Sequence, residues 1–347
     1  MVAAQLAHSP LHLLRILALA ATLAACAGDT TPTRNAEGLA EVILQTDWYA
    51  QPEHGGFYQA KAKGFYAEEG LSVEIRPGAN NNAIPQLVAM NRVHFAVGAT
   101  ETLMIHRSRG IPLVSMFPYF QHDPQCVLFH PESGIETLED LAGREVMFQP
   151  GMLYLDFMEH YMGLGLKLLP MDWSLARFLA DKQFVQQCFL TSEPVVLARQ
   201  GVETGVIPLS ESGFDPYRHV YTNDALLAAQ PELVAAFIRA SIKGWRDFMT
   251  GDPRPAFDLI MQSNPQQNLD LMQDTLAQMK RYSLTEGDIE AGEELGQYDL
   301  TRIGKVIAQL EDIGLLERRV TIEETIALAT LPPSLIVGND TSTALNE

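Results

Sequence analysis

The chain has 347 residues, 47% of them hydrophobic, and a formal net charge of −19 at pH 7. This length and apolar content can bury a large core in two domains or lobes. The negative charge would repel a phosphate backbone, so nucleic acid is not expected as a partner and a solvated acidic surface is. The histidines follow no zinc-type spacing and the cysteines form no CxxC pair, so we expect no metal and no cofactor.

The N-terminus carries a pattern typical of a targeting segment. The apolar run Ile16 to Ala25 follows Arg15 and is too short to span a bilayer. It ends at Cys26 and there resembles the bacterial lipobox, which implies that Cys26 is lipidated and anchors the protein to a membrane. We therefore expect a signal peptide over 1–25 and a polar tether over 26–40. An ordinary secreted protein with a coincidental cysteine is the alternative. At the other end, we expect a flexible polar tail over 331–347.

The stretch after the first apolar run is the first candidate binding corner. Val42-Ile43-Leu44 predicts a β-strand, the polar residues from Asp47 to His54 a loop, and the residues after them a helix. Open α/β sheets bind ligands at such corners. Gly55 would let the backbone approach a solute closely, and Trp48 would offer a flat aromatic surface. Core packing is the alternative role of Trp48.

Strand and helix patterns continue to alternate along the chain. Strands are predicted over 71–76, 94–98, 111–116 and 146–148, with helices over 83–91 and 100–109. This alternation implies an α/β fold with mostly parallel sheets flanked by helices.

Further candidate binding residues lie where these predicted helices begin. Thr100 opens one helix, where it contacts a ligand or caps the helix. Gln149 and Tyr154 lie at a second strand–loop–helix corner. Glu193 opens another helix, where its carboxylate would also suit the helix dipole. Sequence does not decide between these roles.

Cys126 and Cys188 are the cysteines outside the targeting segment. They could form a disulfide in an oxidising compartment, or remain separate buried thiols. Their spacing does not decide between the two.

Several segments carry a resemblance to a known family. The segments DWY, PEH, GFYQA, KGFYAEEGLSVEI, PQLVAMNRVHFAVGATETL, GIPLVSMF and IETLEDLAGREV resemble the type II periplasmic binding proteins of bacterial ABC importers. More narrowly, they are similar to the branch that binds thiamine-pyrimidine precursors. The resemblance spans about residues 41 to 330. It implies two lobes, each a mostly parallel sheet flanked by helices, with 41–128 plus 222–330 in lobe 1 and 129–221 in lobe 2. Hinge crossovers are expected near Phe129 and Tyr221.

The resemblance also implies a site and partners. An aminopyrimidine would stack on Trp48, and Asp47 or Glu193 would accept hydrogen bonds from its amine. The resemblance implies an ABC permease and ATPase as partners, a membrane-anchored location in the periplasm or at the cell surface, and a monomer. The full set of candidate ligand-binding residues is Asp47, Trp48, His54, Gly55, Tyr58, Thr100, Gln149, Tyr154 and Glu193.

Two alternatives change the solute or the role. The solute could be riboflavin, a sulfonate or another aromatic compound, but an anion would require an Arg at a corner, and neither Arg76 nor Arg144 falls at one. A fungal pyrimidine synthase of this fold uses a histidine and a dense cysteine cluster, whereas the matching stretch here, QQCFLTSEP, holds only Cys188. We therefore expect a binding protein rather than an enzyme. A lipoprotein enzyme or sensor without a transport role is the remaining alternative.

Overall fold

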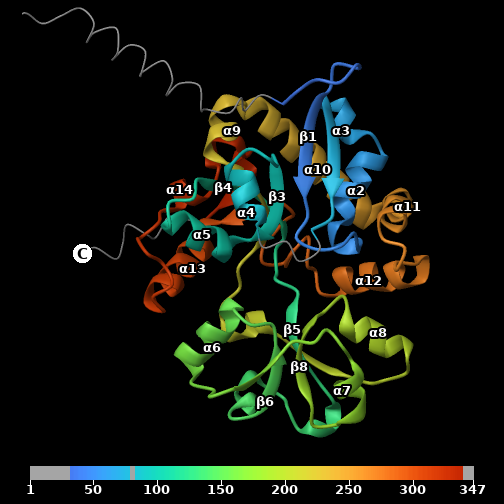
Figure 1. Cartoon of the computed structure of the whole chain (residues 1–347), viewed down its shortest axis with the longest axis vertical. Coiled ribbons are helices and arrows are strands. Elements are labelled where there is room, and N and C mark those ends of the chain that lie inside the picture. The colour runs from blue at the N-terminus through green and yellow to red at the C-terminus, as the bar shows by residue number, and fades with distance from the viewer. Residues whose placement is uncertain (1–31, 79–82, 339–347) are drawn as a thin grey trace, which may run out of the picture.

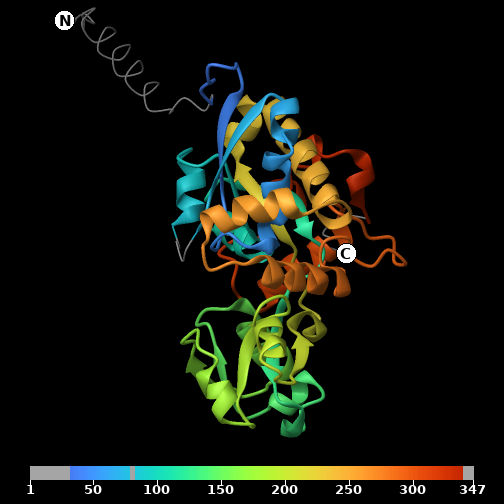
Figure 2. The same cartoon turned by 90° about the vertical axis from the view of Figure 1, so that its right-hand side faces the viewer.

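The structure, a computed structural model, describes residues 32–78 and 83–338. The chain forms two lobes that lie one above the other along the long axis of the molecule (Figure 1). Each lobe is built on a five-stranded sheet with helices packed against it, as Figure 2 shows from the side. The two-lobed α/β fold that the sequence predicts is therefore confirmed. The predicted signal peptide and Cys26 lie outside the described residues.

The first sheet belongs to lobe 1. Its strands, in spatial order, are β2 (Leu71–Arg76), β1 (Ala40–Gln45), β3 (Phe95–Ala99), β10 (Arg218–Asn223) and β4 (Leu113–Phe120). β1 pairs in parallel with β2 and β3, and only β10 runs antiparallel to its neighbours.

The second sheet belongs to lobe 2. Its strands, in spatial order, are β7 (Lys167–Pro170), β6 (Glu145–Phe148), β8 (Val185–Phe189), β5 (Gln125–Phe129) and β9 (Gly205–Pro208). β6 is parallel to both of its neighbours, whereas β5 is antiparallel to β8 and β9. In each sheet the reversed strand is the one that enters directly from the other lobe.

The predicted lobe boundaries fall inside these two entering strands and need correction. Gln125 to Leu128, expected in lobe 1, pair with lobe 2 strands. Arg218 to Tyr221, expected in lobe 2, pair with lobe 1 strands. The crossovers therefore lie between Phe120 and Gln125 and between Pro208 and Arg218. The apolar runs gave no sign of this, because a buried strand has the same sequence pattern in either sheet.

Helices cover both faces of the lobe 1 sheet, and α12 (Leu269–Arg281) lies on the side of lobe 1 that faces lobe 2 (Figure 1). Those of lobe 1 are α2 (Gly55–Ala62), α3 (Phe65–Glu68), α4 (Ile84–Ala89), α5 (Thr100–Ser108), α9 (Asp224–Ala229), α10 (Pro231–Thr250), α11 (Arg254–Ser263), α12, α13 (Leu300–Asp312) and α14 (Ile322–Thr325). Those of lobe 2 are α6 (Leu153–Met162), α7 (Ala176–Ala180) and α8 (Glu193–Arg199). Short 3-10 turns join them, including η2 (Pro52–His54) before α2.

The two lobes also touch through helices on the surface. Arg199 of α8 forms an ion pair with Asp274 of α12, and Tyr161 of α6 donates a hydrogen bond of 2.7 Å to Asp312 of α13. Both pairs are exposed, so each adds little stability. Both contacts join the two lobes, so both would break if the lobes opened.

Both ends of the described chain are more ordered than predicted. Residues 32–39, part of the expected tether, fold back on β1, where Thr33 O accepts from the Glu41 N–H and Arg34 bridges to Ala40. In the expected tail, Leu331 and Leu335 are buried, and β12 (Ile336–Val337) pairs with β11 (Tyr298–Asp299). Within the described ranges, no helix is long and apolar enough to cross a membrane.

Candidate functional site

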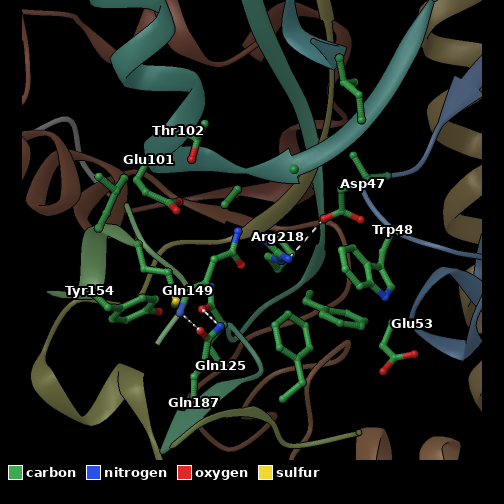
Figure 3. A pocket seen from close by; sticks show the side chains of 18 of the residues that line it. Asp47, Trp48, Glu53, Glu101, Thr102, Gln125, Gln149, Tyr154, Gln187 and Arg218 are labelled. Carbon is green, nitrogen blue, oxygen red and sulfur yellow. Dashed lines mark hydrogen bonds and ion pairs between the residues drawn. The ribbon is translucent and has the colours of Figure 1, made fainter. Parts of the chain in front are cut away.

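A cleft of about 860 Å³ lies between the two lobes. Its walls are formed mainly by the loops after β1, β6, β7 and β8, together with the end of β3, the adjoining helix α5 and the start of β10. Loops at the carboxyl ends of strands are where open α/β sheets carry ligand sites. Figure 3 shows side chains from both lobes converging on this space.

Asp47, in the loop after β1, is the centre of a charged group in lobe 1. Its Oδ1 is 3.0 Å from His54 Nε2, and its Oδ2 accepts a hydrogen bond of 3.3 Å from Arg218 Nη2. Burial opposes the charge of Asp47, but the His54 hydrogen bond and the Arg218 charge lower its pKa to about 2. Asp47 is therefore ionised at neutral pH, and both of its oxygens already have a partner.

Arg218 opens β10 and was not selected from the sequence. Burial disfavours its charge, but Asp123 and Asp47 outweigh burial and raise its pKa. Its Nε is 3.9 Å from Asp123 Oδ2. Neither Arg76 nor Arg144 lines the cleft, whereas Arg218, which was not considered, does. The charge of Arg218 is balanced by two carboxyl groups.

Two tryptophans from different lobes meet across the cleft. Trp48 follows β1, Trp173 lies in the loop after β7, and their ring centroids are 5.3 Å apart with planes tilted by 37°. Trp173 is 55% exposed and has a φ of 60°, in the left-handed region that is unfavourable for a bulky residue. The sequence pattern predicts a helix from Trp173 to Ala180, but α7 begins only at Ala176. Residues with strained backbone conformations cluster at active sites and ligand clamps.

Glu53 and Glu193 line the cleft from lobe 1 and lobe 2, respectively. Thr191 of lobe 2 donates a hydrogen bond of 2.5 Å to Glu53 Oε1 of lobe 1. Glu193 Oε2 accepts a hydrogen bond of 2.8 Å from the Phe189 N–H at the end of β8. Burial raises the pKa of both carboxyl groups. Glu53 therefore contacts the other lobe directly, a role that the sequence did not suggest.

Lobe 2 contributes amide and phenol groups to the cleft. The Gln149 N–H donates to Gln187 Oε1 at 2.9 Å, and Gln187 Nε2 donates to Gln125 Oε1 at 3.3 Å. Tyr154, at the start of α6, is buried and its hydroxyl has no hydrogen-bond partner among the described residues. Burial raises the pKa of Tyr154 well above its usual value, so the phenol stays protonated.

Six of the candidate residues line the cleft, and the other three do not. Those that line it are Asp47, Trp48, His54, Gln149, Tyr154 and Glu193. Their contact with a ligand stays a prediction.

The remaining candidates, Gly55, Tyr58 and Thr100, have other roles. A Cβ on Gly55 would lie 2.1 Å from the Phe248 ring, so this glycine allows α2 to pack closely on α10. Tyr58 is buried away from the cleft, and Thr100 Oγ1 accepts the Tyr217 N–H at 3.1 Å.

Cys126 and Cys188 form a disulfide between the opposed strands β5 and β8. The sequence left this pairing open, because the register of two strands cannot be read from spacing. Within residues 32–78 and 83–338, no group of three or more His, Cys, Asp or Glu side chains is placed to hold a metal ion.

Two α/β lobes, two crossovers and a cleft lined by the carboxyl ends of strands define a periplasmic binding protein fold. The periplasmic aliphatic sulphonate binding protein SsuA from Escherichia coli superimposes with a TM-score of 0.60 at 12% identity, over 86% of this chain and 94% of that one. At this identity the likeness shows the fold alone.

The chain belongs to the NMT1/THI5-like family, whose family model matches residues 51–256, more than half of the sequence. It is 25% identical to the riboflavin-binding protein RibY of Chloroflexus aurantiacus, over 90% of this chain and 92% of that protein. It is 26% identical to the formylaminopyrimidine-binding protein of Halalkalibacterium halodurans, over 89% and 95%. The 4-amino-5-hydroxymethyl-2-methylpyrimidine phosphate synthase of Legionella pneumophila matches at 24%, over 67% and 76%.

Proposed function

We propose that the protein is the solute-binding component of an ABC importer and that it holds a small, flat heteroaromatic solute between its lobes. The observation that carries this proposal is the pair Trp48 and Trp173, which face one another from different lobes at 5.3 Å. At this distance the two rings contact each other, so an aromatic ring held between them requires them to move about 2 Å further apart, since each stacking contact takes about 3.5 Å. Each such contact is worth about 1–3 kcal/mol. Binding would then depend on the lobes opening to admit the ring and closing on it.

An aminopyrimidine is our first choice of solute. The formylaminopyrimidine-binding relative supports it, and so does a cleft lining that includes the carboxyl groups of Asp47, Glu53, Glu101 and Glu193. Carboxyl groups suit a solute that carries an amine and ring nitrogens. Riboflavin is the second candidate, because a relative that covers most of both chains is named for binding it.

A sulfonate or another anion fits less well. The one arginine among the residues that line the cleft, Arg218, is already paired with Asp47. At the start of α5, where unpaired N–H groups would attract an anion, the cleft presents the carboxyl group of Glu101 instead.

The remaining parts of the proposal concern location and partners. The lipobox pattern supports lipidation of Cys26, and the Cys126–Cys188 disulfide suits an oxidising compartment such as the periplasm. An ABC permease and ATPase would be the partners of a monomeric receptor. A synthase role has less support. The stretch QQCFLTSEP, which matches the cysteine cluster of the synthase, holds only Cys188, and Cys188 forms a disulfide with Cys126.

A thermal-shift panel of 4-amino-5-hydroxymethyl-2-methylpyrimidine, riboflavin and an alkanesulfonate tests this proposal. A ligand at a hundredfold excess over its Kd stabilises the folded protein by about 2.7 kcal/mol. We expect the aminopyrimidine, or failing it riboflavin, to raise the melting temperature. Turnover of one panel member without any shift would instead indicate an enzyme.

A further inference from the structure

One carboxyl group in the cleft has an oxygen without a partner. Glu101 is the second residue of α5 and is only 6% exposed. Its Oε2 has no hydrogen-bond partner among the described residues, and Figure 3 shows the side chain directed into the cavity. A buried polar atom without a partner costs about 1–3 kcal/mol, which a solute could recover by pairing with it.

The two acids expected to bind the solute are less available. Both oxygens of Asp47 are held, by His54 and by Arg218. Glu193 already accepts the Phe189 N–H. Glu101 is therefore better placed than either to receive a donor from the solute.

The surroundings of Glu101 favour its neutral form. Burial and the Asp123 carboxylate raise the pKa of Glu101 to about 8, against the opposing effects of the Arg218 charge and of hydrogen bonds from the backbone at Glu101 and Thr102. The Tyr154 phenol, on α6, also lies within electrostatic reach. At pH 7 the free protein thus presents a carboxylic acid, which can donate one hydrogen bond and accept another.

We propose that Glu101 shares its proton with a basic ring nitrogen of the solute while accepting a hydrogen bond from the adjacent exocyclic amine. This inference rests on the proposed function and narrows its solute to a basic aminopyrimidine. The proton stays within the pair, on Glu101 Oε2 or on the ring nitrogen, so no other bond breaks and no proton is released near neutral pH. Once transferred, the proton makes both hydrogen bonds charge-assisted, and such bonds are roughly twice as strong as neutral ones.

A non-basic ring cannot gain this stabilisation. A pyrimidinone or the dione edge of a flavin offers an N–H beside carbonyl oxygens, which accept a hydrogen bond but do not take the proton. Glu101 would therefore discriminate between the two solute classes that bind to relatives of this chain.

Calorimetric titration at pH 7 with 4-amino-2-methylpyrimidine and the similarly shaped 2-methylpyrimidin-4-one tests the pairing. In Glu101→Gln we expect at least about a tenfold loss of affinity for the aminopyrimidine and less than about a threefold change for the pyrimidinone. Glu132→Gln, which removes an exposed acid that does not line the cleft, should change neither. Equal losses for both ligands, or no loss for the aminopyrimidine, would overturn the inference and leave the receptor function intact.

The wild-type protein provides a test that needs no variant. Its affinity for the aminopyrimidine should fall about tenfold per pH unit above pH 8, because the pair must then take up a proton from solution. His122 lies at the first crossover, and its pKa is raised to about 9, so its titration can also change affinity above pH 8. The pyrimidinone is the control for this effect, because its binding involves no shared proton and its affinity would respond to His122 alone. An aminopyrimidine profile no steeper than that of the pyrimidinone would refute the proton-sharing pair.

If the wild-type protein binds riboflavin or the pyrimidinone but not the aminopyrimidine, the inference fails alone. If it binds no heteroaromatic ring, the proposed function fails as well.

Discussion

Replacing Trp173 by glycine separates ligand binding from folding. At a φ of 60° a non-glycine residue is strained by about 1–2 kcal/mol, which glycine would relieve. The substitution also removes the contact with Trp48, worth about 0.5–1.5 kcal/mol. These two effects oppose each other, so the free energy of unfolding should change by less than about 1 kcal/mol, or a few degrees in melting temperature.

Ligand affinity should respond differently. Loss of one stacking partner costs about 1–3 kcal/mol, so the Kd of an aminopyrimidine measured by calorimetry should rise by about 5- to 150-fold. Ser283→Gly is the matched control, because Ser283 also has a positive φ, of 48°, but does not line the cleft. Its Kd should be unchanged. An unaltered Kd in Trp173→Gly would show that the tryptophan pair does not hold the solute.

Three further predictions concern the scaffold. Removing the disulfide with Cys126→Ser and Cys188→Ser opens a loop with a sequence separation of 62 and should lower the free energy of unfolding by about 4 kcal/mol, measured by denaturant titration. Gly56→Ala places a Cβ 2.1 Å from the Trp245 ring and should destabilise the protein by about 1–3 kcal/mol without changing the Kd of the refolded protein. Hydrogen bonds to two carboxylates raise the pKa of His122 from 6.5 to about 9. The protonated His122 therefore adds up to about 3 kcal/mol to the free energy of unfolding. This contribution is complete below pH 6.5 and is lost as the pH rises through 9. His122→Ala should flatten that part of the stability profile, and a slope equal to that of the wild type would contradict the assignment.

The α/β class and the family were predictable from the sequence. Strand and helix patterns alternate at the expected positions, and segments such as KGFYAEEGLSVEI are specific enough to indicate the fold. The lobe boundaries were not predictable to the residue. The apolar run in β5 has the same pattern whichever sheet it joins, and only its pairing with β8 and β9 decides.

The candidate site was predictable where residues follow a strand directly, as Asp47 and Trp48 do. It was not predictable where a residue serves a distant packing partner. Gly55 lies at the expected corner but fits against Phe248 of α10, which is far away in sequence. Trp173 was missed because the residues around it resemble a helix start.

The charged residues of the cleft show the same limit. Arg218 enters lobe 1 only because the second crossover ends just before it. Glu101 was passed over because an acid in the first turn of a helix is a common stabilising feature of helices. Its orphaned Oε2 is visible only once the neighbouring side chains are in place.

A calorimetric titration of the purified protein with 4-amino-5-hydroxymethyl-2-methylpyrimidine tests the receptor function most directly. We predict saturable one-to-one binding, accompanied by a change in tryptophan fluorescence as the solute reaches Trp48 and Trp173. Saturable binding of neither this compound nor riboflavin, or binding that persists unchanged when both tryptophans are replaced, would contradict the account.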